Sequence, residues 1–369
     1  MVSIARKNLF QEPVRLLISV GGVAFSVLLM LFLLGVYRGV LVGSVTYVDK
    51  IPSDLWVCQK GTRNLIRSSS FFPGHLDSVL AKLDGVQKVA SITRSFASAH
   101  IKDREVTMFL LGFDAESGVG GPPEIVAGTA QLIEREMVVD RAFAAKRNLQ
   151  IGDTVAIDQT QFIVKGISDG TNIFAAQFSF IRKEDAQALI GLANVVSFFL
   201  ISLEDTATTA TVSRKITNAI PGAVVMPKEE FMSNNREEVE VGFAPILFAV
   251  LIMGAFVGTV VISLTLFTAT MEKNHEFAVL KALGAGNGFL AQVIFQQALW
   301  NGILGFLAGL GLLVIATNGI ERLVPEVSIV LAARDLVTIF IIACVMGALS
   351  SFMPVRRILR IHPAEVFRL

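Results

Sequence analysis

The sequence predicts an α-helical membrane protein with four transmembrane helices and one large extracytoplasmic α+β domain between helices one and two. Three observations support this prediction. Of the 369 residues, 53% are apolar and only 17% are charged, whereas soluble domains average about 25% charged residues. Four apolar runs are long enough to cross the hydrocarbon core of a bilayer. Residues 44–227, between the first two runs, instead mix strand-like and helix-like patterns with polar turns.

The four apolar runs carry no charged residue along their length. A helix rises ~1.5 Å per residue, so it needs about 20 residues to cross the ~30 Å hydrocarbon core of a bilayer. Each of the four runs reaches this length. The first run exceeds the about 7–15 apolar residues of a signal-peptide core and offers no small-residue cleavage site, so we expect a retained anchor. The runs cover residues 16–37, 241–271, 285–320 and 336–355.

Lys and Arg are distributed unevenly between the two sides of these runs, which predicts the orientation of the chain. Basic residues gather before the first run, after the second run and after the fourth, at Arg6, Lys7, Arg15, Lys273, Lys281, Arg356, Arg357, Arg360 and Arg368. The loop between the third and fourth runs holds only Arg322 and Arg334 beside three acidic residues. We therefore expect a multi-pass protein of the cell (inner) membrane with both termini in the cytoplasm.

These boundaries divide the chain into nine predicted segments. They are a cytoplasmic N-terminal segment (1–15), transmembrane helix 1 with an outer extension (16–43), the extracytoplasmic α+β domain (44–227), a stalk with transmembrane helix 2 (228–271), a cytoplasmic coupling segment (272–287), transmembrane helix 3 (288–317), a short outer loop (318–335), transmembrane helix 4 (336–355) and a cytoplasmic tail (356–369).

The outer domain shows two similar strand–helix–strand patterns. The first has strand-like residues 55–58, a helix starting near Leu76 and ended by Asp84-Gly85, and extended residues 89–93. The second has strand 196–203, a helix capped by Asp205 and broken by Pro221-Gly222, and strand 223–226. Weak internal symmetry is therefore expected.

Three further segments of the domain have their own character. Residues 134–167 are expected to form a mostly β insertion between the two patterns, and residues 118–123 a Gly-Pro surface loop. Residues 228–240 are expected to extend the second span outward as a helical stalk, and a solvated loop is the alternative.

No motif supports catalysis or a resident cofactor. There is no G-x-x-x-x-G-K-[ST] phosphate loop, and the four histidines lie far apart in the sequence, so we expect no catalytic residue and no metal site. Two cysteines cannot form a disulfide framework. A net charge of +1 gives no field that favours nucleic acid. The spans lack the mid-membrane charges typical of ion-coupled transporters.

The most specific segment is the predicted cytoplasmic connector after the second span. Phe277, Leu280 and Lys281 fall on one helical face, and Glu276 lies one turn before Leu280. Apolar residues among charges in such a short loop suit docking onto another protein. A solvated amphipathic connector would show the same pattern.

Two segments of the chain carry a resemblance to a known family. They are Glu276-Phe277-Ala278-Val279-Leu280-Lys281-Ala282-Leu283-Gly284-Ala285 and residues 354–368. The first is similar to the coupling segment, and the second to the closing motif, of the FtsX/MacB-type (type VII) permeases of ABC transporters. The layout of one span, a large outer domain and three further spans also agrees. Residues 54–61 are similar to the compact DevC-like or haem-efflux-like branch.

The resemblance implies a homodimer that docks two copies of an ABC ATPase subunit, which binds ATP and Mg²⁺. In MacB the ATPase is fused at the N-terminus, but only about 15 residues precede the first span, so a separate ATPase is expected. The residues implied to contact it are Glu276, Phe277, Leu280, Lys281 and Gly284. Closure of the ATPase would be transmitted to the outer domains, which is mechanotransmission.

The resemblance also suggests further roles for residues in the spans. Gly35 and Gly39 are candidates for the dimer seam, because a Gly-x-x-x-Gly pair lets two helices approach closely. Gln292 and Gln296 are candidates for a substrate-facing surface, although hydrogen bonding between helices is the more common role. Met30 and Tyr37 are further candidates because both side chains can ligate haem iron, although filling an apolar helix is more common.

Two classes of function remain open at this point. One is a permease that exports or extracts a lipid, lipoprotein, haem or drug, with membrane lipids and a periplasmic adaptor among its partners. The alternative is a regulator that transports nothing and activates an extracytoplasmic hydrolase or sensor. The size and two-part layout of the outer domain favour the permease.

Overall fold

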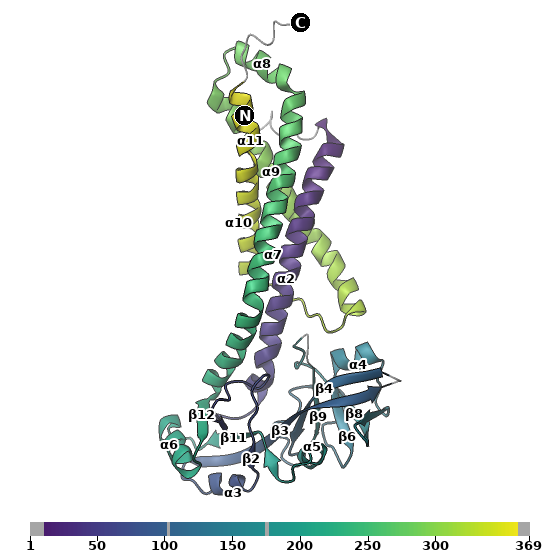
Figure 1. Ribbon diagram of the computed structural model, residues 1–369, viewed down its shortest axis with the longest axis vertical. Coiled ribbons are helices and arrows are strands. Elements are labelled where there is room, and N and C mark those ends of the chain that lie inside the picture. The colour runs from purple at the N-terminus through teal and green to yellow at the C-terminus, as the bar shows by residue number, and fades with distance from the viewer. Residues whose placement is uncertain (1–10, 102–103, 174–176, 361–369) are drawn as a thin grey trace. The chain divides into compact units, whose positions relative to one another are not determined.

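The structure is a computed structural model that describes residues 11–101, 104–173 and 177–360 (Figure 1). The chain divides into two compact units. A helical unit contains residues 1–38, 244–320 and 329–369, and a β-rich unit contains residues 39–243 and 321–328. Two long helices pass from one unit into the other, so the division follows packing and not the ends of the elements.

Among the described residues, four helices contain stretches long and apolar enough to cross a membrane (Figure 1). They are α2 (Pro13–Lys50), α7 (Lys228–Glu272), α9 (Asn287–Leu323) and α10 (Ala333–Ser350). Two short helices lie beside them in the sequence. The helix α8 (Asn274–Ala282) follows α7, and α11 (Phe352–Leu359) follows α10.

Apolar side chains from all four long helices form the core of the helical unit. Fully buried members include Val27 of α2, Ile262 of α7, Ala298 of α9 and Ala343 of α10. Close approach between these helices depends on glycines, since a Cβ at Gly305 of α9 would overlap Val23 of α2. The bundle is thus held by the small-residue packing that replaces the hydrophobic drive between helices in lipid.

The β-rich unit is built on one sheet of ten strands and a separate pair, β2 (Phe72–Pro73) with β10 (Val195–Val196). The ten strands are β1 (Leu55–Gln59), β3 (Val86–Ile101), β4 (Arg104–Phe113), β5 (Ile125–Gly128), β6 (Glu136–Asp140), β7 (Thr154–Ile157), β8 (Thr160–Ser168), β9 (Phe178–Arg182), β11 (Phe198–Leu203) and β12 (Ala223–Pro227). Four helices accompany them, α3 (Leu76–Leu80), α4 (Arg141–Arg147), α5 (Lys183–Leu189) and α6 (Thr209–Ala219).

The strand order is β12-β1-β11-β3-β4-β9-β6-β8-β5, and β7 pairs with both β3 and β8. The 16-residue strand β3 joins two halves of the unit, because Val86–Ile92 pair with β11 and Thr93–Ile101 pair with β4. Each half has its own core. One core contains Leu80 and Ile216 from α3 and α6, and the other contains Phe143 from α4.

Both predicted strand–helix–strand patterns are present, as β1-α3-β3 and β11-α6-β12. Their four strands are adjacent in the sheet, which is a split β-α-β arrangement. The prediction of a mostly β insertion at 134–167 was incomplete. The second half runs from the middle of β3 to α5 and includes helices α4 and α5, whose short length leaves little periodicity in the sequence.

Two local predictions were wrong. The helix α6 begins after Thr208 and not at Asp205. The loop at 118–123 is not wholly on the surface, because Gly120 and Gly121 are buried. The hydroxyl of Tyr47, near the end of α2, donates a buried hydrogen bond to the Gly120 carbonyl oxygen at 2.6 Å. This bond anchors the loop to α2 within the β-rich unit.

The first turns of α7 also belong to the β-rich unit. The Phe231 ring stacks on Trp56 with the ring centroids 4.5 Å apart, and both side chains are fully buried. Asn235 accepts a hydrogen bond from the Leu65 backbone N–H at 3.0 Å. Residues 228–240 therefore form a helix, as predicted, and that helix is packed on the domain before it continues toward residue 272.

Candidate coupling site

The predicted coupling segment contains a short helix, α8, bounded by two changes of chain direction. The helix follows α7 after the single residue Lys273, and it ends at Ala282. Gly284 then adopts a φ of +97°, a conformation that glycine tolerates without a steric cost. The next helix begins at Asn287. The break between α8 and α9 thus covers residues 283–286, and it is not a phosphate loop.

One face of α8 is buried within the helical unit. Phe277 is 5% exposed and packs in a small apolar cluster with Leu290 and Ile294 of α9 and Ile358 of α11. Leu280 packs against the same cluster. Lys281 donates a hydrogen bond to the Leu359 carbonyl oxygen at 3.2 Å. These three residues hold the coupling helix against its own chain.

The expectation that Phe277 and Leu280 contact a partner stays a prediction. Phe277 is buried against its own chain, whereas Leu280 is only half-buried. An amphipathic pattern shows that one face is apolar, but it does not tell which protein covers that face. Glu276 and Gly284, from the same expected set, are exposed. Leu283 was not singled out and is 79% exposed. Glu276 of α8, together with Leu283 and Gly284 just after it, forms an exposed surface that we call the coupling surface.

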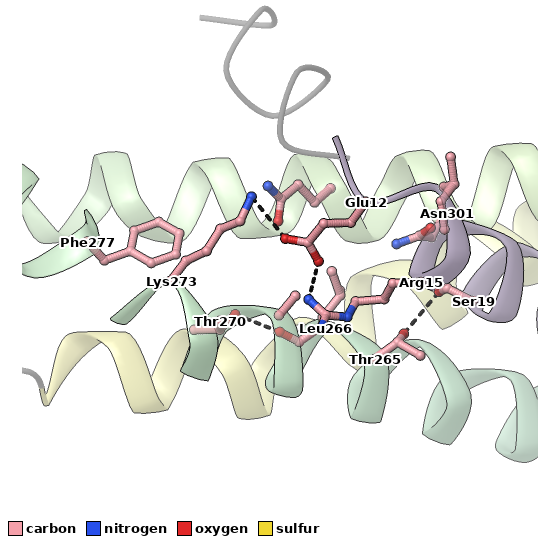
Figure 2. A pocket seen from close by; sticks show the side chains of 12 residues that line it. Glu12, Arg15, Ser19, Thr265, Leu266, Thr270, Lys273, Phe277 and Asn301 are labelled. Atoms are coloured by element: carbon pink, nitrogen blue, oxygen red, sulfur yellow. Dashed lines mark hydrogen bonds and ion pairs between the residues drawn. The ribbon is translucent and has the colours of Figure 1, made fainter. Parts of the chain in front are cut away.

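A network of four charged side chains lies where the start of α2 and the end of α7 meet α8. Figure 2 shows three of them, Glu12, Arg15 and Lys273. Arg15 pairs with Glu12 and, at 2.7 Å, with Glu272, the last residue of α7. Lys273 pairs with Glu12 at 3.2 Å. The network therefore connects the start of α2 to both residues that precede the coupling helix. Opposite charges at matching ends of two spans are the sequence signal that could have revealed it.

A small cavity of about 40 Å³ lies beside this network, and Figure 2 shows the side chains that line it. Its lining includes Glu12, Arg15 and Lys273 of the network, and Phe277 and Asn301. Ser19 and Thr265 also line it and are hydrogen-bonded to each other at 3.0 Å. Asn301 is 2% exposed, and its side-chain oxygen has no hydrogen-bond partner among the described residues. The cavity has room for one or a few water molecules that could satisfy this oxygen.

The assignment of Gly35 and Gly39 to a dimer seam is contradicted by their surroundings. A Cβ at Gly35 would meet Ile329, at 2.7 Å, and Leu331 of the same chain, and a Cβ at Gly39 would overlap the Ser328 carbonyl oxygen. The Val330 backbone N–H donates to the Gly35 carbonyl oxygen at 3.1 Å. The loop between α9 and α10 occupies the face that a second copy would need.

The four candidates for a substrate surface fall into different environments. Met30 is fully buried in the bundle, 3.0 Å from the position of a Cβ at Gly254, so it fills the helix contact and is not substrate-facing. Tyr37 is half-buried on α2. Gln292 is exposed in a shallow groove between α9 and the α10–α11 segment, and Gln296 is half-buried one turn later. The structure does not bring these four residues together into one site.

No group of three or more His, Cys, Asp or Glu side chains in the described ranges has the spacing of a metal site. Both cysteines are free, with Cys58 buried in β1. The coupling site thus combines an exposed surface, an apolar cluster and an ionic network.

Comparison with protein families agrees with this organisation. Residues 248–363 match the FtsX-like permease C-terminal family, and residues 16–219 match the MacB-like periplasmic core domain. An uncharacterised ABC transporter permease of Methanocaldococcus jannaschii is 23% identical over 235 residues, which is 60% of this chain and 58% of that relative. The match thus spans less than two thirds of the relative's length.

Solved structures of outer domains also align with the chain. The periplasmic region of MacB from Actinobacillus actinomycetemcomitans aligns over 49% of this chain and 92% of that chain, with 14% identity and a TM-score of 0.40. The extracellular domain of the transporter YknZ from Gram-positive bacteria aligns over 47% of this chain and 99% of that domain, with 13% identity and a TM-score of 0.37. Scores this low add nothing to the assignment, which depends on the family models.

The MacB-like match alone covers more than half of the chain, and the FtsX-like match covers the helices that flank the coupling site. The chain is therefore a multi-pass membrane protein that belongs to the FtsX/MacB family of ABC transporter permeases.

Proposed function

We propose that this chain is the membrane subunit of an ABC transporter that moves a substrate by mechanotransmission. ATP and Mg²⁺ are bound by a separate ATPase subunit, two copies of which dock on a homodimer of this chain. The four long helices span the cell (inner) membrane with both termini in the cytoplasm, and the β-rich unit is extracytoplasmic. The substrate is a lipid, lipoprotein, haem or drug exported or extracted outside the membrane, with a periplasmic adaptor as a further partner.

The observation that supports this proposal best is the continuity of α7. This helix of 45 residues begins directly after β12, the edge strand of the sheet, and ends two residues before the coupling helix begins. At ~1.5 Å per residue it is about 68 Å long. A displacement of α8 would therefore be passed along a single continuous helix to the outer domain. Pro245, which removes one hydrogen bond from that helix, lies where α7 passes between the two units.

The coupling site supplies the two properties that such a transmission needs. The Phe277 cluster and the Lys281–Leu359 bond fix α8 to α9 and α11, so a force on α8 is not lost in local motion. The coupling surface leaves Glu276 and Leu283 free for contact with a partner.

Co-purification with ATPase subunits from the same host tests the proposal. The native chain in detergent is compared with Glu276→Lys, with Leu283→Asp and with Leu323→Asp. Leu323 is a matched control, because it is 84% exposed at the opposite end of α9. We expect an ATPase to be retained by the native chain and by Leu323→Asp, and to be lost at least tenfold from the other two variants.

Two outcomes would contradict the proposal. If the ATPase is recovered with all four chains, the coupling surface is not its docking site. If no ATPase of the host co-purifies with the native chain, the chain has no partner to supply ATP hydrolysis, and the proposed transporter function is ruled out. An ATPase recovered with the native chain would then be assayed for hydrolysis stimulated by candidate lipids, haem and drugs.

A further inference from the structure

We propose that a groove between α7 and α11 binds the headgroup and upper acyl chains of an anionic phospholipid from the cytoplasmic leaflet. The groove has a volume of about 770 Å³, within the range of pockets that hold small molecules. The inference rests on the membrane placement of α7, α10 and α11 given above, but it does not depend on the ATPase or on the substrate.

The floor of the groove is apolar and exposed. Leu264 of α7 and Phe352 and Met353 of α11 are 62%, 68% and 66% exposed, and all three line the groove. Val260, Ser263 and Phe267 continue the lining along α7. An exposed apolar strip on a membrane helix is where lipid chains are expected, and α11 turns this strip into a concave surface.

The end of the groove is strongly basic. Arg356, Arg357 and Arg360 line it, and they fall with Met353 on one face of α11, at positions i+3, i+4 and i+7. The opposite face, with Pro354 and Ile358, is buried. Helix α11 is thus amphipathic, with charge and apolar surface side by side, as in helices that lie at a membrane interface.

The three arginines lack acidic neighbours in the part of the chain that the structure describes. None of them forms an ion pair there, and no Asp or Glu lines the groove. A guanidinium is always charged and matches a phosphate with two parallel hydrogen bonds. Three such groups next to an apolar groove fit a phosphate that carries acyl chains. A soluble anion would leave the apolar floor uncovered.

Native mass spectrometry of the full-length chain tests the proposal. The chain is purified in detergent, incubated with phosphatidylglycerol or phosphatidylcholine, and the fraction with bound lipid is measured. The test variant carries Arg356→Gln, Arg357→Gln and Arg360→Gln. A matched control removes three exposed charges of the β-rich unit instead, by Lys82→Gln, Lys88→Gln and Arg214→Gln.

We expect the native chain and the control to retain phosphatidylglycerol in preference to phosphatidylcholine. The arginine variant should lose that preference by at least tenfold, since each basic residue near an anionic surface contributes about fivefold. A variant with lysine at the three positions should recover most of the binding, which would show that the loss is due to charge and not to unfolding. Leu264→Gln should weaken phosphatidylglycerol binding while leaving the binding of inorganic phosphate unchanged.

Three results would overturn the proposal. Equal phosphatidylglycerol retention by the native chain and the glutamine variant would show that the arginines bind no lipid. Displacement of the lipid by millimolar inorganic phosphate would indicate a site for a soluble anion. Disulfide formation between two copies carrying Met353→Cys in neutral-lipid vesicles would show that the groove is covered by a second copy of the chain.

Discussion

Lys281 of α8 donates a hydrogen bond from Nζ to the carbonyl oxygen of Leu359, the last residue of α11, at 3.2 Å. The bond joins the coupling helix to the segment that follows the fourth long helix, 78 residues later in the sequence. Together with the Phe277 cluster, it makes α8 part of the helical unit and not a free connector.

Phe277→Ala should loosen α8 without altering the coupling surface. Phe277 is 5% exposed, and removal of a buried phenylalanine ring from a packed cluster costs about 3–5 kcal/mol. Because this cluster is small, we expect local opening of α8 and not global unfolding. Hydrogen exchange of the amides in 274–282 should therefore accelerate by at least tenfold, with little change in α10. Unchanged exchange in α8 would show that the Phe277 cluster does not hold the helix.

The sequence predicted the long helices well because each is an uncharged apolar run longer than a bilayer requires. It also predicted that residues 274–282 carry an apolar face. It could not tell that Phe277 faces Ile358, 81 positions away, because periodicity describes one helix and not its neighbour. Leu283 was missed for the same reason, since a lone exposed leucine has no distinguishing pattern in sequence.

The short elements of the β-rich unit were also beyond prediction. The helices α4 and α5 have seven residues each, about two turns, so an apolar period is barely repeated. The strand β3 was predicted to end near Thr93 but continues to Ile101, since its second half exchanges one partner strand for another. Such partner changes are determined by tertiary contacts and not by local propensity.

Asp335→Ala should destabilise the helical unit. The Asp335 side chain is 6% exposed, pairs with Arg38 of α2 and accepts the Ala332 backbone N–H at 3.1 Å at the start of α10. Loss of hydrogen bonds to a charged group costs about 2–3 kcal/mol. We expect a lower thermal unfolding midpoint in detergent. The double variant Arg38→Ala/Asp335→Ala should lose less stability than the sum of the losses in the two single variants, because each single change already removes the same ion pair. Additive losses would argue against the pair.

Alanine at two glycines of α2 should have opposite effects. Gly21 has open space around its Cβ position, so Gly21→Ala should stabilise by about 0.5–1 kcal/mol through the lower entropy of the unfolded chain. At Gly39 the added methyl overlaps the Ser328 carbonyl oxygen, so Gly39→Ala should destabilise by about 1–3 kcal/mol. The thermal unfolding midpoint of each variant, measured at low protein concentration, distinguishes these two effects. Destabilisation by Gly39→Ala only at concentrations where the chain dimerises would restore the dimer seam.

Cys58 should resist thiol reagents in the folded protein. Its side chain is fully buried in β1, and burial raises its pKa to about 12, so almost no thiolate is present at pH 8. In a Cys344→Ser background, maleimide labelling should be negligible in buffer and rapid in denaturant. Labelling within minutes at pH 8 without denaturant would mean that β1 opens readily.

Asp140 should make the stability of the β-rich unit fall as the pH rises from acid toward neutral. Its carboxylate is fully buried at the start of α4, where it accepts hydrogen bonds from Thr171 Oγ1 at 2.7 Å and the Ala142 backbone N–H at 2.8 Å. Burial raises its pKa in the folded state, and these two hydrogen bonds only partly offset that rise. The unfolded chain therefore loses the proton first, near a pH of about 3.9.

Between the pKa of the unfolded chain and the raised pKa of the folded state, the folded state binds more protons than the unfolded chain. The stabilisation that protonated Asp140 contributes is therefore complete below this pH range and is lost as the pH rises through it. Asp140→Asn keeps an acceptor for the Ala142 N–H but does not titrate, so its stability relative to the native chain should increase as the pH rises from about 3.9 through the raised pKa of Asp140. The limiting slope is about 1.4 kcal/mol per pH unit. Fluorescence of Trp56, stacked on Phe231 in the same unit, follows unfolding in a Trp300→Phe background. A difference between variant and native chain that stays constant across this range would show that Asp140 is ionised equally in both states.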